Sequence, residues 1–216
     1  MRQSLIVTGL ILLIAGTLVF LRSVNINRIG NNQGYAPEQP IEFSHRVHSN
    51  DLEIDCLYCH SGAEKSRAAG IPAAGTCMNC HRFVSAPWDS VQVENQRAEE
   101  ADRDPRLVVS GEIGNLYDAV GFNPDSMEYT GAREPIVWTR VHDLPDFVQF
   151  NHSRHLSAGV ECQECHGQVQ NMERVQQATD LSMGWCVNCH RDVNNGRKSG
   201  LLNDAYASTD CGVCHY

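Results

Sequence analysis

Basic residues are scarce in this chain, which holds 17 lysines and arginines against 26 aspartates and glutamates and has a net charge of −9. Arg2 and Arg22 belong to the N-terminal segment, so the chain from about residue 25 onward has a net charge of about −11. Proteins that bind nucleic acid neutralise phosphates with clustered lysines and arginines. The charge balance therefore excludes nucleic acid as a partner.

No cysteine lies outside one repeated motif, and none precedes residue 56, which excludes an N-terminal lipoprotein anchor. All ten cysteines fall in five copies of Cys-x-x-Cys-His, although chance predicts only about 0.02 copies in a chain with ten cysteines and ten histidines. The copies are Cys56/Cys59/His60, Cys77/Cys80/His81, Cys162/Cys165/His166, Cys186/Cys189/His190 and Cys211/Cys214/His215.

This motif is the attachment signature of c-type haem. Each cysteine pair is expected to form thioethers with haem, and the adjoining histidine is expected to bind the iron as its proximal ligand. Zinc ribbons and disulfide scaffolds also use paired cysteines, but neither requires a histidine directly after every second cysteine. The sequence therefore predicts five covalently bound haem c groups.

Five further histidines remain, one for each expected haem: His45, His48, His142, His152 and His155. They are the candidate distal ligands, and together with the proximal set they indicate two histidines on every iron. An iron with two protein ligands has no open position for a small substrate, which favours electron transfer over catalysis at haem. None of the five motifs carries the lysine in place of histidine that is usual in multihaem nitrite reductases.

The pattern Phe-x-His-x-x-His begins at Phe43 and again at Phe150, and two attachment motifs follow in each case. This block resembles that of the small multihaem cytochromes of the c3/c7 kind. The resemblance implies that His45 binds the first haem and His152 the third, while His48 and His155 reach other haems. His142 has no such pattern, and Met183 is an alternative distal ligand.

Leu5 to Leu21 is the only long apolar run, and as a helix it would measure about 26 Å, the low end for a membrane span. No Ala-x-Ala cleavage pattern follows it, so we expect an uncleaved signal anchor in the cytoplasmic membrane. Arginines on both sides leave the orientation open. Because c-type haem is attached outside the cytoplasm, the haem-bearing part is expected on the periplasmic side.

The expected fold is a multihaem cytochrome c, with mostly short helices and loops packed around five haems and one N-terminal transmembrane helix. Short helices are expected after each motif. Between the modules, Glu94–Asp104 is expected to be a solvated helix or loop, and Gly111–Gly131 an irregular surface segment. The predicted segments are 1–24 (cytoplasmic tip and transmembrane anchor), 25–81 (first two-haem module), 82–141 (insert), 142–190 (second two-haem module) and 191–216 (fifth haem).

Four longer blocks carry a more specific resemblance: Gly34–His45, Gly70–His81, Val141–Phe147 and Met183–His190. They resemble the pentahaem cytochrome c subunit of bacterial alternative complex III. That family implies an electron relay rather than a catalytic quinol site. It implies as partners an iron–sulfur subunit, quinol-binding membrane subunits and a monohaem cytochrome c. The alternative is a free-standing, membrane-anchored multihaem quinol dehydrogenase that feeds a periplasmic reductase.

Overall fold

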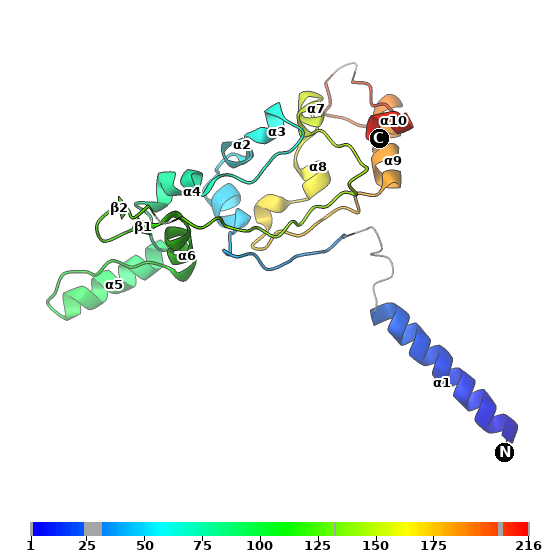
Figure 1. Ribbon diagram of the computed structural model, residues 1–216, viewed down its shortest axis with the longest axis horizontal. Helices are drawn as coiled ribbons and strands as arrows, with labels where there is room; N and C mark the ends of the chain where they lie inside the picture. Colours follow the sequence, from blue (N-terminus) through cyan, green and yellow to red (C-terminus); the bar gives the residue numbers. More distant parts are fainter. Residues whose placement is uncertain (1, 24–31, 132, 203–204, 216) are drawn as a thin grey trace.

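A computed structural model describes residues 2–23, 32–131, 133–202 and 205–215. As expected, it consists of short helices joined by long loops (Figure 1). The helices are α1 (Arg2–Ser23), η2 (Arg46–Asp51), α2 (Cys56–Cys59), α3 (Gly62–Lys65), α4 (Ala74–His81), α5 (Trp88–Glu100), α6 (Gly111–Val120), α7 (His152–Ser157), α8 (Gln163–His166), η3 (Val169–Asn171), α9 (Met183–Asn194) and α10 (Cys211–Cys214). Two short strands, β1 (Phe122–Asn123) and β2 (Glu128–Tyr129), pair in antiparallel fashion.

Every Cys-x-x-Cys-His motif forms a helical turn itself, whereas short helices were expected only after the motifs. In the first motif the amide of His60 donates to the Cys56 carbonyl over 2.9 Å, and the His215 amide donates to the Cys211 carbonyl over 2.8 Å. Two residues three apart lie on neighbouring positions of a helix surface, so this turn brings both cysteines of a motif close together. The helical motif is thus shaped for two bonds to one planar group.

The main hydrophobic cluster lies where α4 packs against α6 and β1 (Figure 1). It consists of Met78, Leu116, Tyr117, Val120 and Phe122. The expectation of an irregular surface at Gly111–Gly131 was therefore wrong, because this segment forms α6 and the β1–β2 hairpin. In α6 the apolar residues recur with helical spacing and face inward, although the glycines suggested a loop.

The second haem motif is fixed to this cluster by two contacts. Met78, inside the motif, is only 2% exposed, and the Tyr117 hydroxyl donates a hydrogen bond to the His81 carbonyl over 2.5 Å. The insert therefore does not merely separate the two modules, because α6 holds one motif in place.

Met78→Ala is expected to destabilise this part of the protein by about 2–5 kcal/mol, because a buried side chain would be replaced by a cavity. Hydrogen exchange of the α6 amides in the haem-loaded protein would measure the change. Met183→Ala is the matched control, since Met183 is 69% exposed and its truncation should change stability by less than about 0.5 kcal/mol. Equal protection of α6 in the Met78 variant and the natural protein would contradict this role.

The insert also contains α5, which is solvated over most of its length. Glu94 of α5 accepts hydrogen bonds from the Arg103 side chain over 2.7 Å and from the Arg106 amide over 2.9 Å. The Arg103 hydrogen bond and then the Arg106 amide lower the pKa of the Glu94 carboxyl to about 2. The expected acidic helix or loop is thus a helix up to Glu100, and Glu94 at its middle binds the chain that follows the helix.

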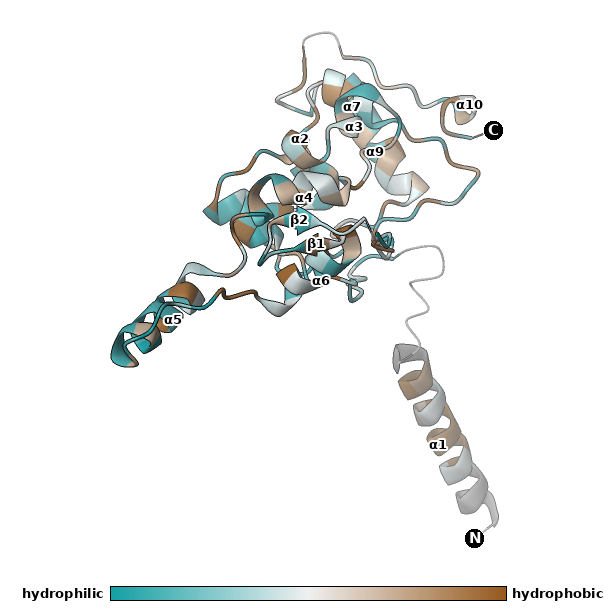
Figure 2. Cartoon of the chain, turned by 60° about the vertical axis from the view of Figure 1, so that its left-hand side comes forward, coloured by the Kyte–Doolittle hydropathy of each residue, from teal (hydrophilic) through white to brown (hydrophobic). Residues whose placement is uncertain are grey.

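The N-terminal apolar run forms α1, in which Figure 2 shows hydrophobic residues in brown. The side chains described within it, from Val7 to Phe20, are exposed. In the part of the chain that the structure describes, no helix is both long and apolar enough to cross a membrane. The structure therefore does not support the expected transmembrane helix. The expected boundary between anchor and haem-bearing part, at residues 24 and 25, lies outside the described residues.

Candidate haem sites

Four pairs of histidines face each other across nearly constant gaps. Each pair joins one histidine of a Phe-x-His-x-x-His block to one motif histidine. The ring centroids are 6.4 Å apart for His45 and His60, 6.0 Å for His48 and His81, 6.5 Å for His152 and His166, and 6.3 Å for His155 and His190. The gap is too wide for direct stacking contact and recurs in both modules.

One metal ion between two imidazoles accounts for this gap. With metal–nitrogen bonds of about 2.0 Å and about 1.1 Å from each nitrogen to its ring centre, the two centroids would be about 6.2 Å apart. The four measured separations lie within about 0.3 Å of that value. The residues present therefore fit iron with two axial histidines at four of the five motifs.

Hydrogen bonds leave the other ring nitrogen of these histidines free for a metal. Six of the eight place Nδ1 within 2.6–2.9 Å of a backbone carbonyl. For example, Nδ1 of His60 donates to the Gly70 carbonyl and Nδ1 of His190 to the Ser208 carbonyl. This contact fixes the tautomer with the proton on Nδ1, so that Nε2 can bind a metal.

Phenylalanine orients each distal histidine pair, a role that the sequence pattern contained but did not assign. Phe43 stacks on His48 at 4.2 Å and meets His45 edge-on at 4.9 Å. Phe150 repeats this with His155 at 4.4 Å and His152 at 4.8 Å. One ring thus holds two imidazoles in different planes, so that two histidines of one short helix face two different motifs.

Burial keeps several of these histidines neutral, the form that binds a metal. Burial, and then the neighbouring histidines, lower the pKa of both His45 and His166 to about 4. Burial also lowers the pKa of His155, although its hydrogen bond to Asn151 opposes the effect. These imidazoles are therefore uncharged at neutral pH without any ligand.

The alternatives raised by the cysteine content find no support. All ten cysteines are described and carry free thiols, so none forms a disulfide. Among the described residues, no three histidine, cysteine, aspartate or glutamate side chains are arranged to hold a metal ion by themselves.

The two cysteines of a motif are not always placed alike, although the sequence predicted the same role for both. In the second motif Cys77 packs against the hydrophobic cluster, whereas Cys80 is exposed. The difference arises because α4 turns its Met78 side toward α6, which leaves Cys80 at the solvent-facing end of the helix. The packing of α6 against α4 therefore gives the two cysteines of this motif different exposure.

The fourth motif differs from the second, because Cys186 and Cys189 are both half-buried in α9. Burial, and then the neighbouring Cys214 thiol, raise the pKa of Cys186. Covalent attachment of haem through Cys80 and Cys189, as through the other eight motif cysteines, stays a prediction, which the haem count per chain would test.

Large apolar side chains are exposed around the motifs, where a porphyrin ring would cover them. Ile71 precedes the second motif, Phe83 follows it, and Val213 lies inside the fifth; they are 57%, 72% and 53% exposed. Exposed apolar side chains of this size often mark a binding surface. Their place beside the cysteine pairs agrees with a large planar hydrophobic cofactor.

The five motifs follow one another in space in the order second, first, third, fourth, fifth (Figure 1). Asn79 of the second motif donates to the Tyr58 hydroxyl of the first over 2.9 Å. Burial and then the Cys56 thiol of the first motif raise the pKa of Cys162 in the third. Lys198, beyond the fourth motif, pairs with Glu164 inside the third.

The fifth motif lies beyond the fourth, since the Cys214 thiol is near enough to Cys186 to affect its pKa. The loop before the fifth motif is fixed by two hydrogen bonds between the Asn194 side chain and the Ala207 backbone, at 2.8 and 3.0 Å. The motifs therefore form a single row from α4 to α10.

The remaining candidate ligands are placed differently. His142 lies against His166, with ring centroids 4.4 Å apart and its Nε2 3.3 Å from Nδ1 of His166. The ring that contacts His215 of the fifth motif is Phe147, at 5.7 Å. Met183 is exposed at the start of α9. The structure thus brings eight of the ten histidines together in facing pairs, and it does not place His142 opposite His215.

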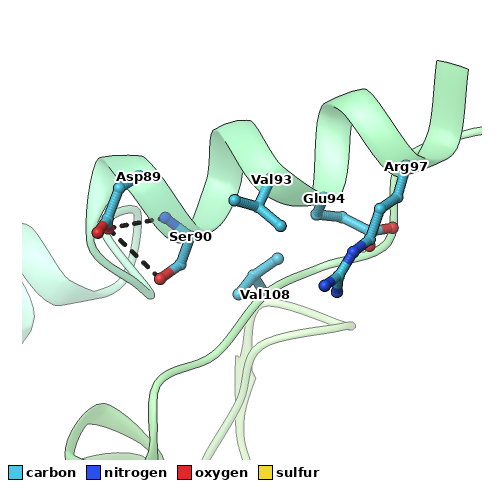
Figure 3. Close-up of a pocket in the computed structure, with 6 residues that line it drawn as sticks. All are labelled: Asp89, Ser90, Val93, Glu94, Arg97 and Val108. Atoms are coloured by element: carbon cyan, nitrogen blue, oxygen red, sulfur yellow. Dashed lines mark hydrogen bonds between the residues drawn. The ribbon is translucent and has the colours of Figure 1, made fainter.

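A cavity of about 380 Å³ lies between α5 and the loop that returns beside it, which carries Val108 (Figure 3). Asp89, Val93 and Val108 are among its lining residues. It contains neither histidine nor cysteine, so it offers no ligand for haem iron.

Comparison with known proteins agrees with the haem interpretation. Residues 148–216, with three of the five motifs, match the family described as cytochrome c7 and related cytochrome c. The chain is also similar to the protein named "Menaquinone reductase, multiheme cytochrome c subunit" from Nitratidesulfovibrio vulgaris (strain Hildenborough). The two are 25% identical over 202 residues, which cover 82% of this chain and 77% of the relative. This chain is thus related to multihaem cytochrome c electron-transfer subunits, in which paired motif cysteines imply c-type haem.

Proposed function

We propose that this chain is a pentahaem electron-transfer subunit that relays electrons from quinol oxidation to a periplasmic cytochrome c or an oxidase. In this proposal it belongs to a membrane complex of the alternative complex III type and is not itself the catalytic quinol site. The similarity to a multihaem subunit of a menaquinone reductase supports a place in a quinone-linked complex.

The spacing of the four histidine pairs carries the proposal. Haem iron, when bound, takes up and releases single electrons, and two axial histidines leave it no position for a substrate. The chain's own contribution is to fix both imidazoles of each pair, through Nδ1 hydrogen bonds to backbone carbonyls and through Phe43 and Phe150. These constraints suit repeated electron transfer, because neither ligand has to move.

The single row of motifs supports a relay with two ends. The second motif lies at one end, beside α5 and α6, and the fifth lies at the other, in α10. A donor and an acceptor could therefore dock at opposite ends of the haem-bearing part. In the proposed complex, these partners are an iron–sulfur subunit and a monohaem cytochrome c.

The exposed apolar side chains of α1 support attachment to the cytoplasmic membrane, beside quinol-binding integral membrane subunits. The haem-bearing part would then lie on the periplasmic side. One helix cannot enclose a quinone by itself, so quinol oxidation is assigned to the partner subunits.

Deletion of residues 1–24, with export directed by a cleavable signal, tests this division of labour. The shortened chain should be released in soluble form, keep all its haem and accept electrons from dithionite. It should lose electron transfer from quinol, because quinol is confined to the bilayer. Absorbance spectra after each reductant would measure both reactions.

The control is the full-length chain, purified from its native membrane together with its associated subunits. It should accept electrons from quinol. Quinol oxidation by the isolated shortened chain would refute the relay and favour the free-standing quinol dehydrogenase. Loss of haem from the shortened chain would overturn the assignment of residues 1–24 to anchoring alone.

A further inference from the structure

His142 is the one histidine outside the attachment motifs that does not belong to a Phe-x-His-x-x-His block, and its position is informative. It is half-buried in the loop before α7, and its Nε2 lies 3.3 Å from Nδ1 of His166. His166 also faces its partner His152, with ring centroids 6.5 Å apart. His166 thus has one histidine at a metal-sized separation and another, His142, beside its Nδ1.

The chemistry of His166 fixes the direction of this contact. If Nε2 of His166 binds iron, its proton is on Nδ1, which must then donate. The atom that faces it is Nε2 of His142, which must accept and therefore carries no proton. That nitrogen is the one with which His142 would otherwise bind an iron.

At three other motifs, a backbone carbonyl accepts the Nδ1 hydrogen bond of the motif histidine. His60, His81 and His190 donate Nδ1–H to the carbonyls of Gly70, Val84 and Ser208. After His166 the chain turns sharply at Gly167, which has a φ of 66°. A Cβ at this glycine would lie 2.6 Å from the Ala178 Cβ, so the turn requires glycine.

We propose that His142 positions the proximal ligand of the third haem by accepting the hydrogen bond of His166, and that it does not bind the fifth iron. The chain has ten histidines. Eight form the four facing pairs and one is His142, so His215 is the only histidine that remains for the fifth iron. The inference rests on haem attachment but not on the proposed electron partners.

Three full-length, haem-loaded proteins test the proposal: the natural chain, His142→Ala and His142→Gln. EPR should count the same number of low-spin haems in all three, with four bis-histidine irons. In His142→Ala one haem, the third, should change its reduction potential upward, because an acceptor on Nδ1 makes the imidazole a stronger ligand. The amide oxygen of His142→Gln can also accept this hydrogen bond, so this variant should restore the potential.

The shifted haem is identified by adding His152→Ala, which opens the third iron. The haem that responds to His142→Ala should then be the opened one. A new high-spin haem or a new carbon monoxide site in His142→Ala alone would show that His142 is an iron ligand and overturn the proposal. Five bis-histidine irons in the isolated natural chain, or an unchanged potential in His142→Ala, would also overturn it. A failed quinol assay would not affect these readouts.

Discussion

A chain made without covalent haem will not keep residues 142–215 folded. Among the described residues, the buried apolar side chains are Ala63, Met78, Ala86, Ala98, Leu116, Tyr117, Val120, Phe122 and Val141. None of them lies after Val141, and the buried residue that does, Gln177, is polar. Ordering a backbone costs about 1–2 kcal/mol per residue, which burial of side chains in this half cannot offset.

The experiment is to produce the chain in the cytoplasm, where c-type haem is not attached, and to compare it with exported protein. Limited proteolysis should degrade residues 142–215 of the haem-free chain first, while the α4–α6 cluster resists longer. The exported control should contain five haems per chain by the pyridine haemochrome assay and resist the protease throughout. A haem-free chain with a protected second half would show that its loops have a core that does not depend on porphyrin.

The second large effect is expected from the four histidines that face motif histidines. His45→Ala, His48→Ala, His152→Ala and His155→Ala should each convert one haem of five from low-spin to high-spin, the first, second, third and fourth respectively. The haem count should stay at five because thioethers hold the porphyrin. EPR and redox titration would measure the change, since loss of an axial ligand alters spin state and potential.

Pairs of substitutions give a sharper result. His45→Ala combined with His48→Ala should open two irons, although His45 directly precedes η2 and His48 lies within it. His142→Ala is the matched control for the spin state, because the structure places this histidine against another histidine and away from a metal-sized gap. It should open no iron, although the potential of the third haem should shift. If His45→Ala and His48→Ala open the same iron, the assignment from the ring separations is wrong.

Sequence patterns predicted c-type haem, and the match to cytochrome c7 agrees, because covalent attachment requires fixed residue types at fixed spacing. The same patterns could not show which motif histidine faces His48 or His155, since those contacts depend on how distant loops pack. The fold of α6 was missed for a local reason. Gly111, Gly114 and Gly121 suggested a loop, while Leu116 and Val120 contribute to an apolar face that stabilises the helix only when α4 packs against it.

The unequal burial of the motif cysteines could not be predicted either. Five identical motifs suggest five identical environments, yet Cys80 is exposed and Cys189 is half-buried. The spacing of a motif determines which bonds its residues can make. Its burial depends on what packs against the helix, which for α4 is a segment more than thirty residues further along the chain.

The place of His142 was missed for a similar reason. A count of ten histidines for five irons suggested equal sharing, but a count contains no geometry. A histidine can support a ligand instead of being one, and only the contact with His166 distinguishes the two roles. The tight turn at Gly167, which carries the chain away from His166, was the signal available in the sequence.

The hydrogen bond between the two halves of the chain affects how they could have evolved. Nδ1 of His152 donates to the Arg67 carbonyl over 2.7 Å, and α3 packs directly against α7. The repeated blocks indicate an ancestral duplication, yet a ligand of the second half is now oriented by the backbone of the first. A gene fragment that encodes residues 142–216 alone would therefore specify the attachment motifs without the support for its first distal histidine. The second half therefore depends on the first for the position of this candidate ligand.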